Sequence, residues 1–268
     1  MSERTDYPSG APCWVETLQP DPDAAAQFYG QLFGWQFDEP KPMPGGLGGK
    51  YLAARIAGRL VAGIGQAPAS APTALWSTCI SVDGIEAALT RVAGAGGAVI
   101  VGPLQAGPDG RVAVVTDPAG VAFGLWQPAE RIGAQLVNEP GTWAMSALHT
   151  PSPERARSFY GTVLGWQLQP VPGAPLAFWR LPGYVGGGQS QPMPDDVVAV
   201  MTPIDEASEI PPHWAVNFCV EDVDATAEHA AALGGQLLLP PTDAPGFRSA
   251  LIADPQHGVI AISAATST

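Results

Sequence analysis

Charged residues are scarce in this sequence, and basic residues are the scarcest of them. Only 14% of the 268 residues are charged, and 12 Lys and Arg stand against 25 Asp and Glu, for a formal net charge of −13. An average soluble domain has about 25% charged residues. A chain this acidic has no general attraction for phosphate backbones or anionic lipid surfaces. The sequence therefore predicts neither nucleic-acid binding nor membrane binding.

Cysteines and long apolar runs are also nearly missing. The three cysteines, Cys13, Cys79 and Cys219, form no Cys-x-x-Cys pair and lie in apolar runs, which predicts reduced, buried thiols. The longest uncharged stretch, 60–82, contains prolines and polar residues and is not expected to span a bilayer. The first residues lack the apolar core of a signal peptide. We therefore expect a cytoplasmic protein.

The sequence does contain an internal repeat. Residues 21–35 read DPDAAAQFYGQLFGW and residues 152–166 read SPERARSFYGTVLGW, so that a Pro, Phe-Tyr-Gly and Gly-Trp coincide. An Asp-Pro turn sequence follows in each half, at 117 and at 254. A half-chain is therefore duplicated, and the length suits two average domains. We predict domains at 11–128 and 142–264, joined by a linker at 129–141.

Each half contains two further units, in which a short apolar run precedes an amphipathic helix and β-type runs follow it. The leading runs begin at residues 14, 76, 143 and 214 and are rich in aromatic and β-branched residues. Asp21 and Asp83 are predicted as N-caps of the first two helices. Four βαβββ units predict an α+β fold with antiparallel pairing between consecutive strands. The acid- and proline-rich segment 190–212 is predicted as an exposed loop.

Four such units in tandem, with the Phe-Tyr-Gly…Gly-Trp helix and the Asp-Pro…Gly turn, resemble the vicinal oxygen chelate superfamily of glyoxalases, bleomycin-resistance proteins and extradiol dioxygenases. The sequences GLWQP (124–128) and LVNEPGT (136–142) resemble tandem-domain actinobacterial members labelled glyoxalase-like or hydroxylase. The resemblance covers both predicted domains and implies two tandem cup-shaped glyoxalase-like sheets. In the enzymes of this family, His and Glu side chains inside the cup hold a divalent metal, which chelates two vicinal oxygens of the substrate.

The metal ligands that the resemblance implies have no counterparts at the corresponding positions. By register, these positions fall close to Trp14, Ser77, Gly124, Met145, Ala215 and Ile262, with the remaining two around 62–64 and 186–188. A metal site needs three or four converging nitrogen, oxygen or sulfur ligands. We therefore expect no metal and no other cofactor in either cup.

Strand alternation predicts which side chains face the inside of each cup. The ligand-binding candidates are apolar, aromatic or small polar residues on predicted strands: Trp14, Ser77, Cys79, Trp126, Met145, Trp179 and Asn217. The three tryptophans among them either stack on a planar ligand or pack in the core.

Two residues are weak catalytic candidates. Glu16 lies inside the first predicted strand, where it is either a base with a raised pKa in an apolar cup or a solvated acid. His149 ends a strand and is either an acid or base at the cup mouth or a surface histidine. The repeat-related Arg111 and Arg248 either grip an anionic ligand or pair with an acid of the linker.

Together these features predict a metal-free small-molecule-binding protein of the glyoxalase/bleomycin-resistance type, which binds or sequesters an aromatic or polyketide-like metabolite. One alternative is an accessory enzyme of secondary metabolism, hydroxylase-, lyase- or isomerase-like, that uses Glu16 or His149. The other is a protein-interaction module whose cups are collapsed cores. The partner expected is a small organic ligand, in at most one cup, and the tandem halves predict a monomer or a weak homodimer.

Overall fold

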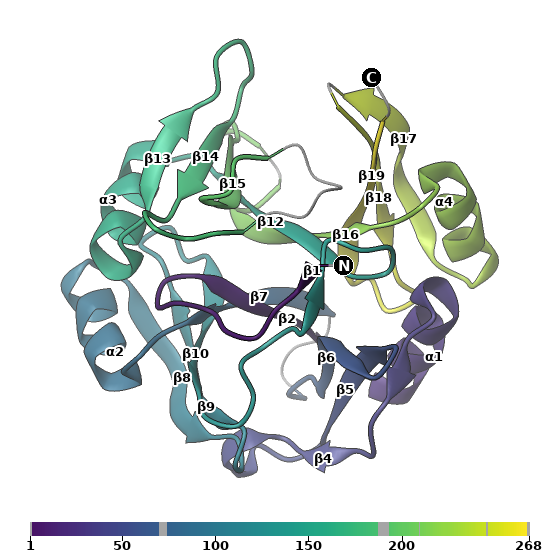
Figure 1. The fold of residues 1–268 in the computed structure, drawn as a ribbon, viewed down its shortest axis with the longest axis horizontal. Coiled ribbons are helices and arrows are strands. Elements are labelled where there is room, and N and C mark those ends of the chain that lie inside the picture. The colour runs from purple at the N-terminus through teal and green to yellow at the C-terminus, as the bar shows by residue number, and fades with distance from the viewer. Residues whose placement is uncertain (1, 70–73, 187–192, 209, 245, 267–268) are drawn as a thin grey trace.

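The computed structural model describes residues 2–69, 74–186, 193–208, 210–244 and 246–266, which form two sheets, each with helices on its convex side (Figure 1). The first half contains β2 (Pro12–Gln19), α1 (Pro22–Phe33), β3 (Gln36–Phe37), β4 (Lys41–Pro42), the short 3₁₀ helix η1 (Pro44–Gly46), β5 (Lys50–Ile56), β6 (Arg59–Gln66), β7 (Leu75–Ser81), α2 (Ile85–Gly94), β8 (Ala98–Gln105), β9 (Gly110–Thr116) and β10 (Ala122–Pro128). The second half contains β12 (Trp143–Thr150), α3 (Pro153–Leu164), β13 (Gln167–Pro170), β14 (Ala177–Arg180), β15 (Val197–Pro203), β16 (His213–Cys219), α4 (Val223–Ala232), β17 (Gln236–Ala244), β18 (Phe247–Ala253) and β19 (Val259–Ala265).

The two sheets have the same topology. Their strand orders are β3-β5-β6-β2-β7-β10-β9-β8 and β13-β14-β15-β12-β16-β19-β18-β17, and β4 also pairs with β5. Consecutive strands after each helix pair antiparallel, as predicted. Each unit is closed by a parallel pair between its first and last strands, so both sheets are mixed. The predicted α+β class, the four βαβββ units and the tandem arrangement are confirmed.

The N-cap residues in the structure agree only in part with those predicted from the sequence. Asp21 caps α1 by accepting hydrogen bonds from the backbone N–H groups of Asp23 and Ala24, at 3.0 and 3.1 Å. The prediction of Asp83 as the cap of α2 is wrong, because Gly84 occupies that position. The side-chain oxygen of Gln127, on the neighbouring strand β10, accepts the N–H of Ile85 at 3.0 Å and so satisfies one of the unpaired N–H groups at the start of α2.

The loop predicted over 190–212 is wrong for its central part. Residues 197–203 form β15, which pairs parallel with β12 near the centre of the second sheet. Val198, Ala199 and Met201 are buried there. The loop was predicted because the segment as a whole is polar, but it contains a short apolar, β-branched run that is long enough for a strand.

The repeated sequence motifs meet at the interface between the two halves. Helix α1 lies beside α4, and α2 lies beside α3 (Figure 1). The Tyr29 hydroxyl donates to Asp254 Oδ2 at 2.7 Å, and its repeat counterpart Tyr160 donates to Asp117 Oδ2 at 3.2 Å. Each repeated tyrosine is therefore anchored by the Asp-Pro turn of the other half. The repeat preserves a reciprocal interface as well as a helix.

The segment between the domains is a structured part of the first one. Within it, β11 (Leu136–Val137) pairs with β1 (Ser2–Glu3), and the N–H of Ala134 donates to the carbonyl of Cys13 at 2.8 Å. A Cβ atom at Gly133 would overlap that same carbonyl, so only glycine allows this close approach. The linker thus covers part of the first sheet. No helix in the described ranges is long and apolar enough to cross a membrane.

Candidate functional site

The concave face of the first sheet, called the first cup below, contains a chain of hydrogen bonds. The Trp14 indole N–H donates to the Tyr51 hydroxyl at 2.8 Å, and that hydroxyl donates to Glu16 Oε2 at 2.7 Å. The Cys79 thiol lies 3.9 Å from Glu16 Oε1. Strand alternation therefore placed Trp14, Glu16 and Cys79 on the same face, as predicted. Ser77 is half-buried two residues before Cys79 on the same strand.

Tyr51, on β5, is a central residue of this cup that the sequence analysis did not identify. It fills the space opposite Gly63, where any Cβ atom would overlap the tyrosine hydroxyl. A glycine inside a strand commonly marks such a close approach. Gly63 was therefore the available signal, although it does not say which side chain fills the space.

Arg131 enters the first cup from the linker. Its guanidinium carbon lies 4.3 Å from the centre of a Trp126 ring and 4.8 Å from the centre of a Trp14 ring, within cation–π distance of both rings. The side chain is only 12% exposed, and its Nε lies 3.7 Å from Asp109 Oδ2. Within the described part of the chain, Nε and Nη1 make no hydrogen bond. The predicted ligand-stacking faces of Trp14 and Trp126 are thus covered by a cation of the protein itself.

Burial sets the protonation of the groups around Glu16. Burial, reinforced by the nearby Glu16 carboxylate, raises the pKa of both the Tyr51 hydroxyl and the Cys79 thiol. Burial alone would lower the pKa of Arg131, but interactions with Tyr51, Glu16 and Asp109 outweigh it, so that this pKa is raised. At neutral pH the cup therefore holds a neutral tyrosine, a neutral thiol and a charged guanidinium.

A cavity of about 520 Å³ opens at the mouth of the first cup, with Tyr51 and Arg131 in its lining. This volume lies in the range of small-molecule sites, about 300–1,000 Å³. The lining includes four basic side chains, namely Arg4, Lys41, Arg55 and Arg131, and four acidic ones, namely Asp38, Glu39, Asp109 and Glu130. The pocket is therefore more polar than the apolar walls predicted, because the linker and the neighbouring loops contribute charged residues.

The residues of the first cup do not fit a divalent metal. Glu16 is the acid among the inward residues of the central strands, and it already accepts the Tyr51 hydroxyl. Its strand neighbours Gly63 and Ser77 offer no carboxylate, imidazole or thiolate. No three His, Cys, Asp or Glu residues come together for a metal anywhere in the described ranges. A guanidinium inside the same cup would repel the ion as well.

The second cup contains a stacked histidine pair. The rings of His149 and His213 lie 4.6 Å apart at an angle of 5°. Asn217 donates to Ser263 Oγ at 2.8 Å, while its own Oδ1 has no hydrogen-bond partner among the described residues. One metal-ligand position was predicted around 186–188, and Gly187 and Gly188 of that range lie outside the described residues. The last strand of that unit is β15, so the register position falls on 197–203 instead.

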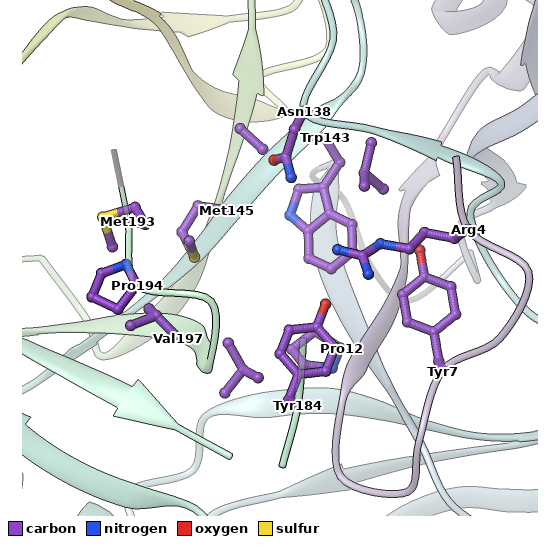
Figure 2. A pocket seen from close by; sticks show the side chains of 13 residues that line it. Arg4, Tyr7, Pro12, Asn138, Trp143, Met145, Tyr184, Met193, Pro194 and Val197 are labelled. Atoms are coloured by element: carbon purple, nitrogen blue, oxygen red, sulfur yellow. The ribbon is translucent and has the colours of Figure 1, made fainter. Parts of the chain in front are cut away.

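The remaining two candidates, Met145 and Trp179, do not line the cavity of about 520 Å³. Met145 lines a pocket of about 40 Å³ with Trp143, Tyr184 and Met193 (Figure 2), which is room for a water molecule rather than an organic ligand. Trp179 is fully buried against Tyr160 and Trp166, at ring distances of 5.5 and 5.7 Å. It therefore lies on the helix-covered face of the second sheet and not in the cup.

The histidine pair predicts acid sensitivity. Burial and the neighbouring His213 lower the pKa of His149 to about 4, against about 6.5 in an unfolded chain. Between these values the unfolded chain binds more protons, so the folded state loses stability as the pH falls from about 6.5 to 4. We expect His149→Gln to remove on the order of 2 kcal/mol of this loss, measured by urea unfolding at several pH values. The exposed control His229→Gln should leave the pH dependence unchanged, and an NMR titration of His149 near pH 6.5 would contradict the prediction.

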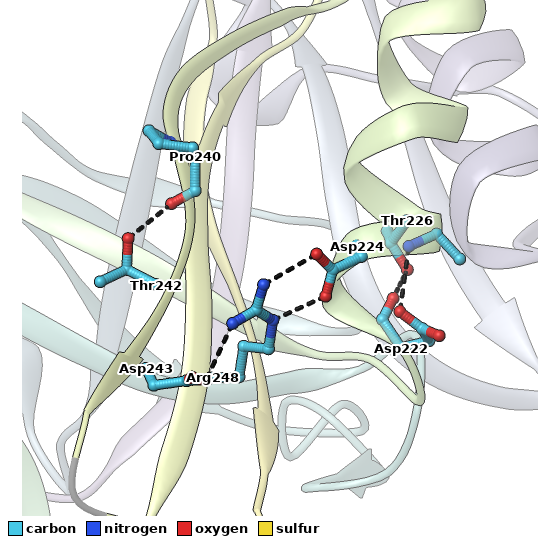
Figure 3. Close-up of polar contacts among 8 residues, drawn as sticks. Asp222, Asp224, Thr226, Pro240, Thr242, Asp243 and Arg248 are labelled. Carbon is cyan, nitrogen blue, oxygen red and sulfur yellow. Dashed lines mark hydrogen bonds and ion pairs between the residues drawn. The ribbon is translucent and has the colours of Figure 1, made fainter.

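Arg111 and Arg248 form ion pairs with acids of the adjacent helix. Arg248 contacts Asp224 on α4 at 2.6 Å and Asp243 on β17 at 2.8 Å (Figure 3). Arg111 contacts Glu86 on α2 at 2.5 Å. These acids belong to the helices and an edge strand rather than to the linker, so the expected partner was wrong. Both arginines tie the last hairpin of their domain to its helix.

Comparisons with known proteins agree with this fold. The model of the Glyoxalase/Bleomycin resistance protein/Dioxygenase superfamily matches residues 14–125, and that of the Glyoxalase-like domain matches residues 145–262. CFP32 of Mycobacterium bovis, which carries a provisional glyoxylase name, is 38% identical over 98% of this chain and 97% of that protein. The anthracycline biosynthesis protein DnrV of Streptomyces peucetius is 34% identical over 95% of this chain and 92% of its own length.

Solved structures resemble the chain in fold alone. The Mn(II)-bound glyoxalase from Novosphingobium aromaticivorans superimposes with a TM-score of 0.64 at 17% identity, covering 95% of this chain and 82% of that one. The 2,3-dioxygenase LapB from Pseudomonas sp. KL28 superimposes with a TM-score of 0.63 at 13% identity, covering 94% and 91%.

Proposed function

Because this chain belongs to the Glyoxalase/Bleomycin resistance protein/Dioxygenase superfamily, we propose that it is a metal-independent small-molecule-binding protein whose ligand occupies the cavity at the first cup. The observation that carries this proposal is the cavity of about 520 Å³ above Tyr51 and Arg131. Its floor is held in place by hydrogen bonds and stacking rather than by a set of metal ligands. A preformed pocket of this size also counts against a protein-interaction module with collapsed cups.

The ligand proposed is an oxygenated aromatic metabolite of the polyketide type. Two observations support this choice. The charged lining of the cavity matches a ligand with several oxygen atoms, and the relatives DnrV and DauV are named as anthracycline biosynthesis proteins. The function is to bind or sequester such a molecule.

A second candidate is an enzyme that works without a metal, and the Tyr51–Glu16 hydrogen bond favours it. Tyr51 lines the cavity and its hydroxyl donates to Glu16, so these two groups could pass a proton to or from a bound ligand. His149 has no such connection to this cavity. Turnover lost in both Tyr51→Phe and Glu16→Gln, with binding retained, would favour the enzyme over the binding protein.

Native mass spectrometry tests the proposed function, with 1,8-dihydroxyanthraquinone as the probe. We expect one molecule per chain, and no change in binding when Mn²⁺ or Zn²⁺ is added. Ala53→Trp should abolish binding because Ala53 lines the cavity and an indole would fill it. The matched control Ala147→Trp fills the second cup and should retain binding.

Three results would overturn this proposal. The first is a failure of the probe to bind at up to about 1 mM. The second is binding that only Ala147→Trp abolishes, which would place the ligand in the second cup. The third is a stoichiometric bound metal that the probe requires.

A further inference from the structure

We propose that residues 38–49, called the lid segment below, form a movable lid that gates the cavity at the first cup. This inference rests on the proposed function, because it concerns the entry of a ligand into that same cavity. It assigns control of the rates of binding and release to the connection between β3 and β5.

The lid segment connects the two ends of the first sheet. It leaves the edge strand β3, pairs with β5 through β4, and brings η1 beside β8, which is the edge strand at the opposite end of the sheet. In Figure 1 it runs along the bottom of the view, between β5 and the hairpin of β8 and β9. Its residues Asp38, Glu39 and Lys41 line the cavity. The segment therefore forms one wall of the cavity and reaches the opposite wall.

An ion pair joins the two walls of the cavity. Lys41 Nζ, from the lid segment, lies 3.6 Å from Asp109 Oδ2, from the turn between β8 and β9, and both residues belong to the lining. Their side chains are 63% and 25% exposed. Ion pairs with this much exposure are weak and are screened by salt. This contact can therefore break at little cost.

Two apolar contacts also hold the lid segment against the sheet. The Leu104 side chain on β8 packs on the backbone of Gly45, where any Cβ atom would overlap it. Met43 reaches the other way, to Gly65 on β6, where a Cβ atom would lie 3.0 Å from the Met43 sulfur and 2.9 Å from Leu18. Leu18 lies on the concave face of β2, so the Met43 side chain lies inside the cup.

The backbone of the lid segment favours opening. Gly45, Gly46, Gly48 and Gly49 have φ angles between 62° and 80°, and glycine loses more conformational freedom than any other residue when a segment is fixed. Leu47, which lies among them, is 58% exposed and gives the closed form little burial. Exposed side chains and few buried contacts are typical of segments with low local stability, the class to which lids belong.

The second half offers a comparison within the same chain. Its corresponding connection, residues 171–176 between β13 and β14, is shorter and is closed by the N–H of Val171, which donates to the Leu176 carbonyl at 3.0 Å. In Figure 1 this hairpin extends outward at the top of the view instead of running toward β17. The crossing segment thus distinguishes the cup with the cavity of about 520 Å³ from the other cup.

A lid has a kinetic signature that a direct ligand contact lacks. Ligand passes through the open form on the way in and on the way out. A change that weakens the closed form therefore raises the association and dissociation rate constants together and leaves Kd nearly unchanged. Loss of a direct contact raises the dissociation rate constant alone and so raises Kd.

Stopped-flow measurement of tryptophan quenching by 1,8-dihydroxyanthraquinone, an uncharged probe at neutral pH, tests the lid. In the unaltered protein, raising NaCl from about 20 to about 300 mM should increase the association rate constant about two- to threefold, because salt screens the Lys41–Asp109 pair. Lys41→Met should raise this rate constant at low salt and remove its salt dependence. Leu104→Ala, outside the cavity lining, should raise both rate constants at least about threefold and keep Kd within about twofold.

Leu239→Ala is the matched control, because Leu239 is an exposed leucine on β17, the equivalent edge strand of the second sheet. It should change neither rate constant. An association rate constant that does not rise with salt, or a Leu104→Ala protein in which only dissociation is faster, would overturn the lid and leave the proposed function standing. Failure of the probe to bind the unaltered protein would overturn the proposed function and this inference together. Should Leu104→Ala not fold, the salt series on the unaltered protein still decides.

Discussion

Replacing Asp254 by alanine is expected to lower the free energy of unfolding by about 4 kcal/mol. The carboxylate is buried at the domain interface, and Oδ2 accepts from Gln19 and Tyr29, both at 2.7 Å. Oδ1 accepts the N–H groups of Gln256 and Gly258, both at 2.8 Å. Alanine removes four hydrogen bonds to a charged group and leaves the Tyr29 hydroxyl buried without its acceptor. Urea unfolding of the whole chain measures the loss.

The repeat supplies an internal comparison for this prediction. Asp117 occupies the equivalent place in the other half but accepts three hydrogen bonds, and the one from Tyr160 is longer, at 3.2 Å. Asp117→Ala should therefore cost less than Asp254→Ala. The exposed Asp83→Ala is the surface control and should cause no measurable loss. If Asp254→Ala behaved like Asp83→Ala, the interface would not depend on the reciprocal tyrosine–aspartate contacts.

Glu16→Ala is expected to lower the free energy of unfolding by about 3 kcal/mol. The change leaves the Arg131 guanidinium without the acid inside the cup and the Tyr51 hydroxyl without its acceptor. Glu16→Gln should cost less because an amide oxygen can still accept that hydroxyl.

A double-mutant cycle of Glu16→Ala and Arg131→Met measures how much of the lost stability comes from the interaction between these two charged side chains. Because the Glu16 carboxylate interacts electrostatically with the Arg131 guanidinium, adding Arg131→Met to Glu16→Ala should recover part of the lost stability, with a coupling of about 1 kcal/mol. The same cycle on the exposed pair Glu86 and Arg111 should show much weaker coupling. Strict additivity of Glu16→Ala and Arg131→Met would show that the two side chains do not interact.

The sequence was most informative where a local period decides the structure. The two-residue period of strands placed Trp14, Glu16 and Cys79 on one face correctly. The repeat predicted four units and the two domains that contain the family matches. It could not show that Phe-Tyr-Gly and the Asp-Pro turn meet across the molecule, since Tyr29 and Asp254 are 225 residues apart.

The candidate site was less predictable, because its residues come from segments that are far apart in the sequence. Tyr51 and Arg131 belong to different segments, and neither lies in a motif. Only the folded chain brings the Arg131 guanidinium within 5.8 Å of the centre of the Tyr51 ring. For Trp179, the sequence predicted a ligand-binding residue inside the cup, and this prediction is wrong. It lies on a strand of only four residues, too short for alternation to fix its face from sequence, and the structure buries it under α3.

The path of the linker has a consequence for how such proteins diverge. Residues 129–141 exist as a connection only because two copies of the domain are joined in one chain, yet they provide the cation of the first cup. The cation beside Trp14 and Trp126 therefore comes from a segment outside both parts of the chain that the family models match. Substitutions in this connecting segment can change what the cup selects while the sheets, helices and interface remain untouched.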